Sequence, residues 1–196
     1  MGDVMLTSAH AHSWGCDLMD RITESFLAEF VHDRGLDSLE QSALFEHLAS
    51  FVALRRHYNG ETFDTSDIVT GSGGDTGVDA VGILVNGSLV TDVESLEDHS
   101  DLSGNFDVAF VFVQAERSAS FDGAKLGSFG FGVRDFFEPK PKLIRNSMVS
   151  DRAEVMEALY KLGTKFRPGN PTCRLYYITT GNWVGDANLA RIMHQV

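Results

Sequence analysis

Two almost purely apolar runs constrain the fold of this chain more than any other feature of its sequence. They cover residues 78–85 and 108–113, and valine is the most frequent residue in both. Short apolar runs that are rich in β-branched residues and bounded by turn signals are typical of strands buried on both faces. The sequence therefore predicts a central sheet with both of its faces covered.

Helical patterns before and after these runs supply the covering layers. Gly35 is the predicted C-terminal stop of a first helix, and Asp37 or Ser38 is the predicted N-terminal cap of a second. Apolar residues recur at the spacing of an amphipathic helix in four segments: 14–33, 38–58, 121–137 and 151–162.

The remaining segments complete the sheet. The dipeptide Asn86-Gly87 is a strong signal for a hairpin, and the acidic segment 91–105 is expected to form a loop or a short turn of helix. Shorter strands are expected at 68–69, from residue 89 and at 174–180. The predicted fold class is thus α/β, with a mixed central β-sheet flanked by helices.

Length and composition limit the class of protein. The 196 residues suit one compact domain, and 43% of them are hydrophobic. No stretch approaches the ~20 apolar residues that span a bilayer and no signal pattern opens the chain, so we expect a cytoplasmic protein that does not enter a membrane. The net charge of -12 argues against a passive nucleic-acid binder, which usually carries a basic face, but it does not exclude a nuclease.

A glycine-rich run, 71–77, leads into the first apolar strand. No Gly-Lys-Ser/Thr triplet follows it, so it is not a P-loop, and it precedes a strand instead of opening a helix, so it is not a dinucleotide-binding turn. A tight turn and a phosphate cradle both stay open for this run. Asp79 follows it, and a carboxylate buried there is costly unless it is paired, binds a metal or caps the turn.

Two polar side chains end the second apolar strand. Gln114 and Glu116 are two residues apart, so they point to the same face of the sheet. An acid beside such a pair is an arrangement by which a nuclease can hold a divalent metal ion against a phosphodiester. The alternative is a strand that simply leaves the core, with Arg117 pairing to Glu116 on the surface.

Several segments resemble, in the same order, the N-terminal part of the AIPR (abortive infection phage resistance) proteins. This family has a core like that of the PD-(D/E)xK nucleases, in the branch that carries Gln-x-Lys. The resemblance covers roughly residues 37–181 and implies a restriction-endonuclease-like fold. The matching segments are 74–80, 85–87, 112–115 and 127–137.

The resemblance implies a role for each candidate residue. Asp79 would be the principal metal-binding carboxylate, Gln114 would take the second acid position, and Glu46 would complete the shell of a Mg²⁺ or Mn²⁺ ion. The expected activity is hydrolysis of DNA phosphodiesters by a domain of a bacterial phage-defence protein, with a homodimer expected by analogy. The basic residues Lys140, Lys142 and Arg145 would position the nucleic-acid backbone.

Position 116 departs from the family pattern, because Glu116 stands where the family has a lysine. Three interpretations stay open. Glu116 is itself a metal ligand or a base; or Lys125, on the following helix, replaces the missing cation; or the domain is catalytically inactive. In the last case the alternative function is a nuclease-fold domain that binds nucleic acid or a protein partner.

We expect three parts along the chain. Residues 1–36 form an N-terminal helical segment, residues 37–181 form the nuclease-like α/β domain, and residues 182–196 begin a further segment. The last prediction rests on a helical pattern near the end that has no C-terminal cap, and it implies that the chain is an N-terminal fragment of a longer protein.

Overall fold

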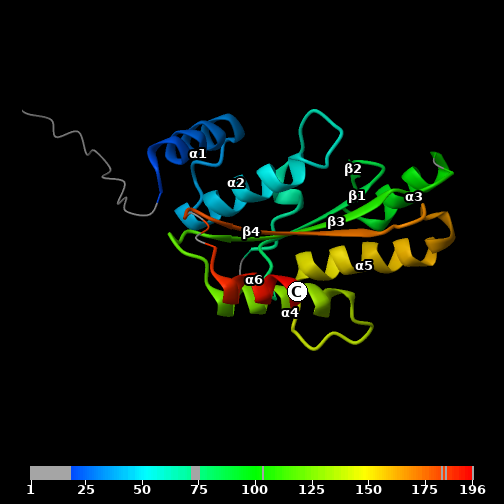
Figure 1. Ribbon diagram of the computed structural model, residues 1–196. Helices are drawn as coiled ribbons and strands as arrows, with labels where there is room; N and C mark the ends of the chain where they lie inside the picture. Colours follow the sequence, from blue (N-terminus) through cyan, green and yellow to red (C-terminus); the bar gives the residue numbers. More distant parts are fainter. Residues whose placement is uncertain (1–18, 72–75, 103, 182, 184, 196) are drawn as a thin grey trace, which may run out of the picture.

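The computed structural model describes residues 19–71, 76–102, 104–181, 183 and 185–195. It shows a four-stranded mixed sheet with helices on both faces, which confirms the predicted α/β class (Figure 1). The strand order is β2-β1-β3-β4; β1 is antiparallel to β2 and β3, and β3 is parallel to β4. The strands are β1 (Ala80–Val85), β2 (Ser88–Leu89), β3 (Val108–Glu116) and β4 (Thr172–Thr179).

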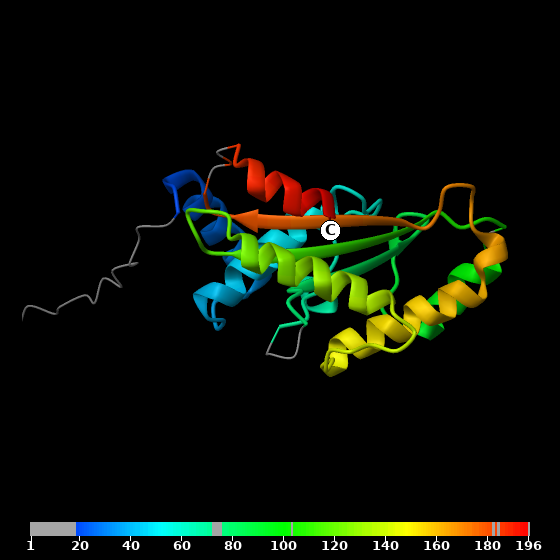
Figure 2. The same cartoon turned by 60° about the horizontal axis from the view of Figure 1, so that its bottom comes forward.

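The helices form a layer on each side of the sheet. Helices α1 and α2 lie on one side, and α4, α5 and α6 lie on the other (Figures 1 and 2). The described helices are α1 (Arg21–Arg34), α2 (Gln41–Arg55), α3 (Val93–Leu102), α4 (Gly123–Phe137), α5 (Ser147–Lys161) and α6 (Ala187–Gln195), with 3-10 turns at Thr65–Asp67 and Gly163–Lys165. None of the described helices is long and apolar enough to cross a membrane.

The predicted ends of two elements, which depend on residues with a left-handed backbone conformation, are confirmed. Gly35 ends α1 in the left-handed region, at φ 64°. Asn86 and Gly87 also have positive φ, 53° and 81°, and they join β1 to β2 as the predicted hairpin.

Other predicted boundaries were wrong. Helix α2 begins after Glu40, whose side chain makes no capping hydrogen bond, so neither Asp37 nor Ser38 is the cap. The strand expected at 68–69 is reduced to one bridge between Val69 and Ala80. The acidic segment contains a helix of three turns, α3, because Leu96 anchors it in the core. Residues 14–18 of the first predicted helix lie outside the described residues.

The core is divided by the sheet into two layers. On β3, Phe110 and Phe112 pack toward α4 and α5, whereas Val111 and Val113 pack toward α2. This alternation places Gln114 and Glu116 on the α4 side of the sheet. On β1 the same period sends Val81, Ile83 and Val85 to the α4 side and Ala80 and Leu84 to the α2 side.

Helix α6 extends the layer formed by α4. A Cβ atom built on Gly123 would lie 3.1 Å from Ile192 Cδ1 and 3.3 Å from Leu189 Cδ2, so the two helices pack closely. Leu189 and Ile192 both contact the core on this side of the sheet. The division of the chain at residues 36 and 181 stays a prediction.

Helix α4 approaches the turn before β1 more closely than any side chain would allow. A Cβ atom on Gly132 would lie 2.1 Å from the carbonyl oxygen of Thr76, a separation that real atoms do not show. Gly132 is buried, and the contact fixes the backbone just ahead of Asp79. A glycine in a helix therefore has a packing reason here that outweighs its poor helix propensity.

Replacing Gly132 with alanine is expected to lower the free energy of unfolding by roughly 1–3 kcal/mol, because the new methyl group overlaps the Thr76 carbonyl. Gly127→Ala is the matched control on the same helix. Apart from the backbone of its own helix, no atom of the described residues lies within 4 Å of the position that a Cβ atom on Gly127 would take, so this change should stabilise the protein by up to ~1 kcal/mol. Urea denaturation of both variants measures the difference; two changes of the same sign would contradict the packing argument.

His47 makes the stability depend on pH. It is buried on α2, its Nδ1 lies 2.6 Å from Thr65 Oγ1, and burial lowers its pKa despite the nearby charge of Asp64. The unfolded chain, with a pKa of about 6.5, therefore binds more protons than the folded protein. The contribution of His47 is complete above that value and is lost as the pH falls through the folded pKa.

Denaturation curves measured from pH 7.5 to 4.5 should accordingly show stability falling less steeply in His47→Gln than in the parent protein. His32→Gln, at an exposed position on α1, serves as the control and should follow the parent curve. Identical pH profiles for the parent and His47→Gln would contradict the assignment.

Candidate functional site

Asp79 lies at the end of the sheet where β1 begins, and it is fixed by main-chain contacts. Its amide donates to the carbonyl of Val113 (2.8 Å), and its Oδ2 accepts a hydrogen bond from the amide of Ala115 (2.6 Å). The side chain is buried, with 9% of the residue's surface exposed. Since these two partners flank Gln114, the carboxylate of Asp79 lies directly beside the end of β3.

Gln114 and Glu116 lie on the α4 face of the sheet, as their spacing predicts. Gln114 Nε2 donates to Glu116 Oε1 over 3.4 Å, a long hydrogen bond that orients the amide nitrogen of Gln114 toward the carboxylate. The side-chain oxygen of Gln114 therefore points away from the Glu116 carboxylate. Both side chains are half-buried, so a ligand can reach them.

Lys125 reaches Glu116 from helix α4. Its Nζ lies 2.6 Å from Glu116 Oε2, and the side chains of Lys125 and Glu116 are 55% and 17% exposed. An ion pair whose lysine is this exposed contributes little to stability, about 1 kcal/mol or less. Its importance is chemical, because a lysine ammonium group stands beside position 116. Among the described residues the partner of Glu116 is thus Lys125, and the surface pair with Arg117 is not formed.

The position of Lys125 follows from the start of α4. Asp122 caps this helix, and its Oδ1 accepts hydrogen bonds from the amides of Ala124 (2.8 Å) and Lys125 (3.1 Å). Lys125 therefore lies in the first turn, where the helix dipole adds positive potential. The hydrogen bond to Glu116, and then its charge, raise the pKa of Lys125, so the side chain is a cation at neutral pH.

Tyr177 lies on β4 beside Gln114 and Glu116. It is the β4 partner of Gln114 in the parallel pairing with β3. Its hydroxyl is buried, without a well-formed hydrogen bond to any described residue. Burial, followed by the charge of Glu116, raises the pKa of Tyr177. Its ring contacts Phe121 and Phe129 with centroid separations of 5.8 and 6.4 Å, which closes the site on the side of α4.

Glu46 approaches the same end of the sheet from the opposite face. It lies on α2, and its Oε2 is 3.6 Å from the position that a Cβ atom on Gly71 would take. The neighbouring residue, Thr70, donates its amide hydrogen to the carbonyl of Asp79 (2.8 Å). Glu46 and Asp79 therefore border the same short segment, Glu46 on the α2 side and Asp79 at the edge of the sheet.

The basic segment is anchored to this same segment. Asn146 Nδ2 donates to the carbonyl of Thr70 over 2.7 Å and so ties the loop between α4 and α5 to the backbone beside Asp79. Lys140 and Lys142 are exposed on that loop. Arg145 binds the end of α4: its guanidinium group donates to the carbonyls of Asp135 (2.7 Å) and Phe136 (3.1 Å).

The structure thus collects Asp79, Gln114, Glu116 and Lys125 at one end of the sheet, with Glu46 near the same turn. Within the described residues, no three His, Cys, Asp or Glu side chains form a group that could hold a metal ion. The predicted metal ligands Glu46, Asp79 and Gln114 nevertheless suit Mg²⁺ or Mn²⁺, because each of them offers an oxygen atom. Mg²⁺ is commonly held by one or two carboxylates together with water and substrate phosphate, so a group of three protein ligands is not required for its binding.

Two members of this neighbourhood were not predicted from the sequence. Tyr177 carries no motif, and only the strand pairing shows that it lies opposite Gln114. Asn146 is the cap of α5, a role its residue type suggests, but its contact with Thr70 depends on how the loop folds back. The sequence signal that could have identified Asn146 is an asparagine directly before an amphipathic helix, which is typical of an N-terminal cap.

Comparison with known proteins adds no relative: no protein-family model, curated protein or solved structure matches this chain. The resemblance to the AIPR proteins therefore stays a prediction from the segments that carry it.

Replacing Glu116 with glutamine is expected to lower the pKa of Lys125, because the change removes the charge and weakens the hydrogen bond that raise it. NMR titration of the lysine side-chain ¹³Cε signals measures the effect directly. The signals of the exposed Lys140 and Lys142 serve as internal references and should titrate identically in the two proteins. An unchanged curve for Lys125 would show that the ion pair does not form in solution.

Proposed function

We propose that this chain is a metal-dependent nuclease domain of a bacterial phage-defence protein, with a restriction-endonuclease-like core, that hydrolyses phosphodiesters of DNA. The observation that carries the proposal is the ion pair of 2.6 Å between Lys125 and Glu116, next to Gln114 and Asp79. It offers a lysine ammonium group at the position where the family pattern requires one, although position 116 itself is a glutamate. The interpretation in which Lys125 replaces the missing cation is the one that the geometry supports.

The residues of the site have separable tasks in this proposal. Glu116 uses one of the three donor positions of the Lys125 ammonium group and thereby holds it in place. The other two donors would contact a phosphate oxygen of the substrate, where positive charge stabilises the negative charge that develops during hydrolysis. Gln114 donates to Glu116 through its side-chain nitrogen, and its side-chain oxygen would be a ligand of the ion.

Asp79, the Gln114 carbonyl oxygen and Glu46 would hold the Mg²⁺ or Mn²⁺ ion. When bound, such an ion supplies Lewis-acid stabilisation of the phosphoryl oxygen and makes a water molecule more acidic. The amide of Ala115 fixes the orientation of the Asp79 carboxylate before any ligand arrives. Lys140 and Lys142 lie on a loop anchored beside Asp79, and they would contact the phosphates that flank the reacting one.

The alternative is a catalytically inactive domain of the same fold that binds nucleic acid or a protein partner. Two observations favour it. The described residues hold no three acidic, histidine or cysteine side chains together as a metal site. The ion pair also neutralises Lys125 in part, which would weaken its contact with a phosphate.

The decisive comparison uses Asp79→Asn and Lys125→Met, each assayed with Mg²⁺ or Mn²⁺ on duplex and single-stranded DNA. Both changes should lower the cleavage rate about 10²–10³-fold, the usual cost of removing one stabilising group from a transition state. Lys161→Met, at an exposed position on α5, controls for the loss of a surface charge and should cleave like the parent.

Cleavage that is insensitive to both changes would remove Asp79 and Lys125 from the mechanism. A parent protein that cleaves nothing, but whose Glu116→Lys variant cleaves, would identify a nuclease fold disabled at position 116. Calorimetry with Mn²⁺ separates the remaining cases. Binding of Mn²⁺ that is lost in Asp79→Asn supports the proposed ion site, whereas a protein that binds no Mn²⁺ supports the alternative.

A further inference from the structure

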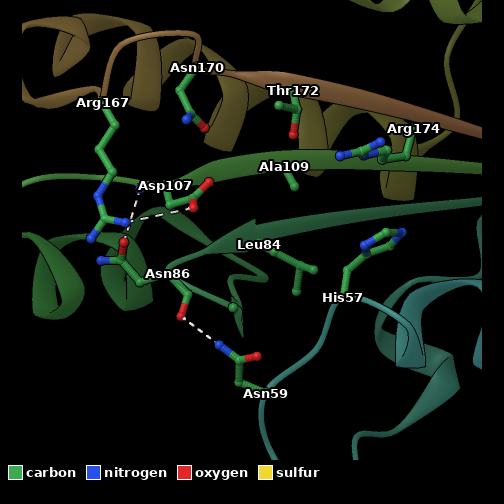
Figure 3. Close-up of a pocket in the computed structure, with 11 residues that line it drawn as sticks. His57, Asn59, Leu84, Asn86, Asp107, Ala109, Arg167, Asn170, Thr172 and Arg174 are labelled. Carbon is green, nitrogen blue, oxygen red and sulfur yellow. Dashed lines mark hydrogen bonds and ion pairs between the residues drawn. The ribbon is translucent and has the colours of Figure 1, made fainter.

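A hollow lies at the end of the sheet opposite the candidate site, beyond the C-terminus of α2 (Figure 3). It has a volume of about 580 Å³, within the range of sites that take small-molecule ligands. Its walls come from the hairpin after β1, the start of β3, the start of β4 and the chain that follows α2. The polar residues that matter are His57, Asn86, Arg167, Asn170, Thr172 and Arg174.

This pocket is separate from the candidate nuclease site. Ala109 lines it, whereas Gln114 and Glu116 lie five and seven residues further along β3. At the rise of a strand, this separation is about 17–23 Å. The pocket is on the α2 side of the sheet, because Thr172 and Arg174 alternate with the β4 residues that face α4.

The cationic groups of the pocket are incompletely paired. The side chain of Arg174 makes no hydrogen bond or ion pair with any residue that the structure describes, and it points into the hollow beside His57 (Figure 3). Arg167 is paired with Asp107 only over 3.8 Å, and both of these side chains are more than half exposed. In a chain with a net charge of -12, two arginines facing one pocket form a local positive site.

The neutral side chains of the wall present donors. Asn86 and Asn170 each use the side-chain oxygen to accept a backbone hydrogen bond, from Asp107 (2.9 Å) and Val108 (2.8 Å). Their amide nitrogens, which can only donate, make no hydrogen bond to the described part of the chain. His57 is held by Tyr176, whose hydroxyl lies 2.7 Å from His57 Nε2. The wall is therefore rich in donors and has one carboxylate, Asp107, at its edge.

We propose that this pocket binds a phosphate-bearing ligand of nucleotide size, with Arg174 as the principal contact to the phosphate. Guanidinium groups match the geometry of phosphate oxygens, and the amides of Asn86 and Asn170 can hydrogen-bond the rest of the ligand. The ligand is either a free mononucleotide or the terminal phosphate of a nucleic-acid strand. The inference does not depend on the proposed nuclease activity, because no residue is shared between the two sites.

Isothermal titration with inorganic phosphate, AMP and adenosine tests the proposal on the full chain. AMP should bind, and adenosine should bind at least about tenfold more weakly, because only AMP carries the charge that Arg174 recognises. Arg174→Gln should weaken AMP binding about 10- to 100-fold. Arg134→Gln is the control, an exposed arginine on α4 that should leave the affinity unchanged.

A pair of short oligonucleotides, with and without a 5′-phosphate, distinguishes the two sources. Tighter binding of the phosphorylated strand, lost in Arg174→Gln, together with no binding of AMP assigns the pocket to strand ends. Binding of AMP assigns it to free nucleotides. The proposal is overturned if neither AMP nor the phosphorylated strand binds, or if Arg174→Gln, folded by circular dichroism, binds both as the parent does.

Discussion

The antiparallel pairing of β1 with β3 is the interaction on which the rest of the structure depends. It sends Phe110 and Phe112 into the core beneath α4, and by the same alternation it brings Gln114 and Glu116 to the edge of that core. It also places Asp79 against the backbone on both sides of Gln114. A slip of one residue would turn every one of these side chains to the opposite face, so the register that builds the core also builds the candidate site.

Helix α4 adds the positive charge to that site. Its N-terminal end is fixed by the cap at Asp122, and further along it is held close to the turn before β1 by Gly132. Lys125 is thereby presented to Glu116 from a rigid element, and the cation reaches the end of β3 from a helix and not from the strand itself. In the proposed function, Lys125 would thus supply from a neighbouring helix the charge that the family pattern has at position 116.

The sequence predicts those parts of the fold that short-range physics decides. Apolar runs located β1 and β3, and Gly35 and Asn86-Gly87 located the ends of elements, because conformation there depends on one or two residues. Helix α3 was underestimated because a single buried residue, Leu96, anchors an otherwise polar segment. The sequence left Lys125 as one of three interpretations of position 116, and the packing of α4 beside β3 is what brings its side chain to Glu116. The pocket at Arg174 depends on packing between distant segments, so no spacing along the chain could show it.

The central claim is tested most directly by a crystal structure of the protein with Mn²⁺, in which the anomalous signal locates the ion. Such a structure shows whether the collected oxygen donors form an ion site. The account predicts a peak in contact with the Asp79 carboxylate and the Gln114 carbonyl oxygen, on the side away from the Lys125–Glu116 pair. A protein saturated with Mn²⁺ that shows ordered ions only elsewhere, with Asp79 bonded solely to the protein, would contradict it.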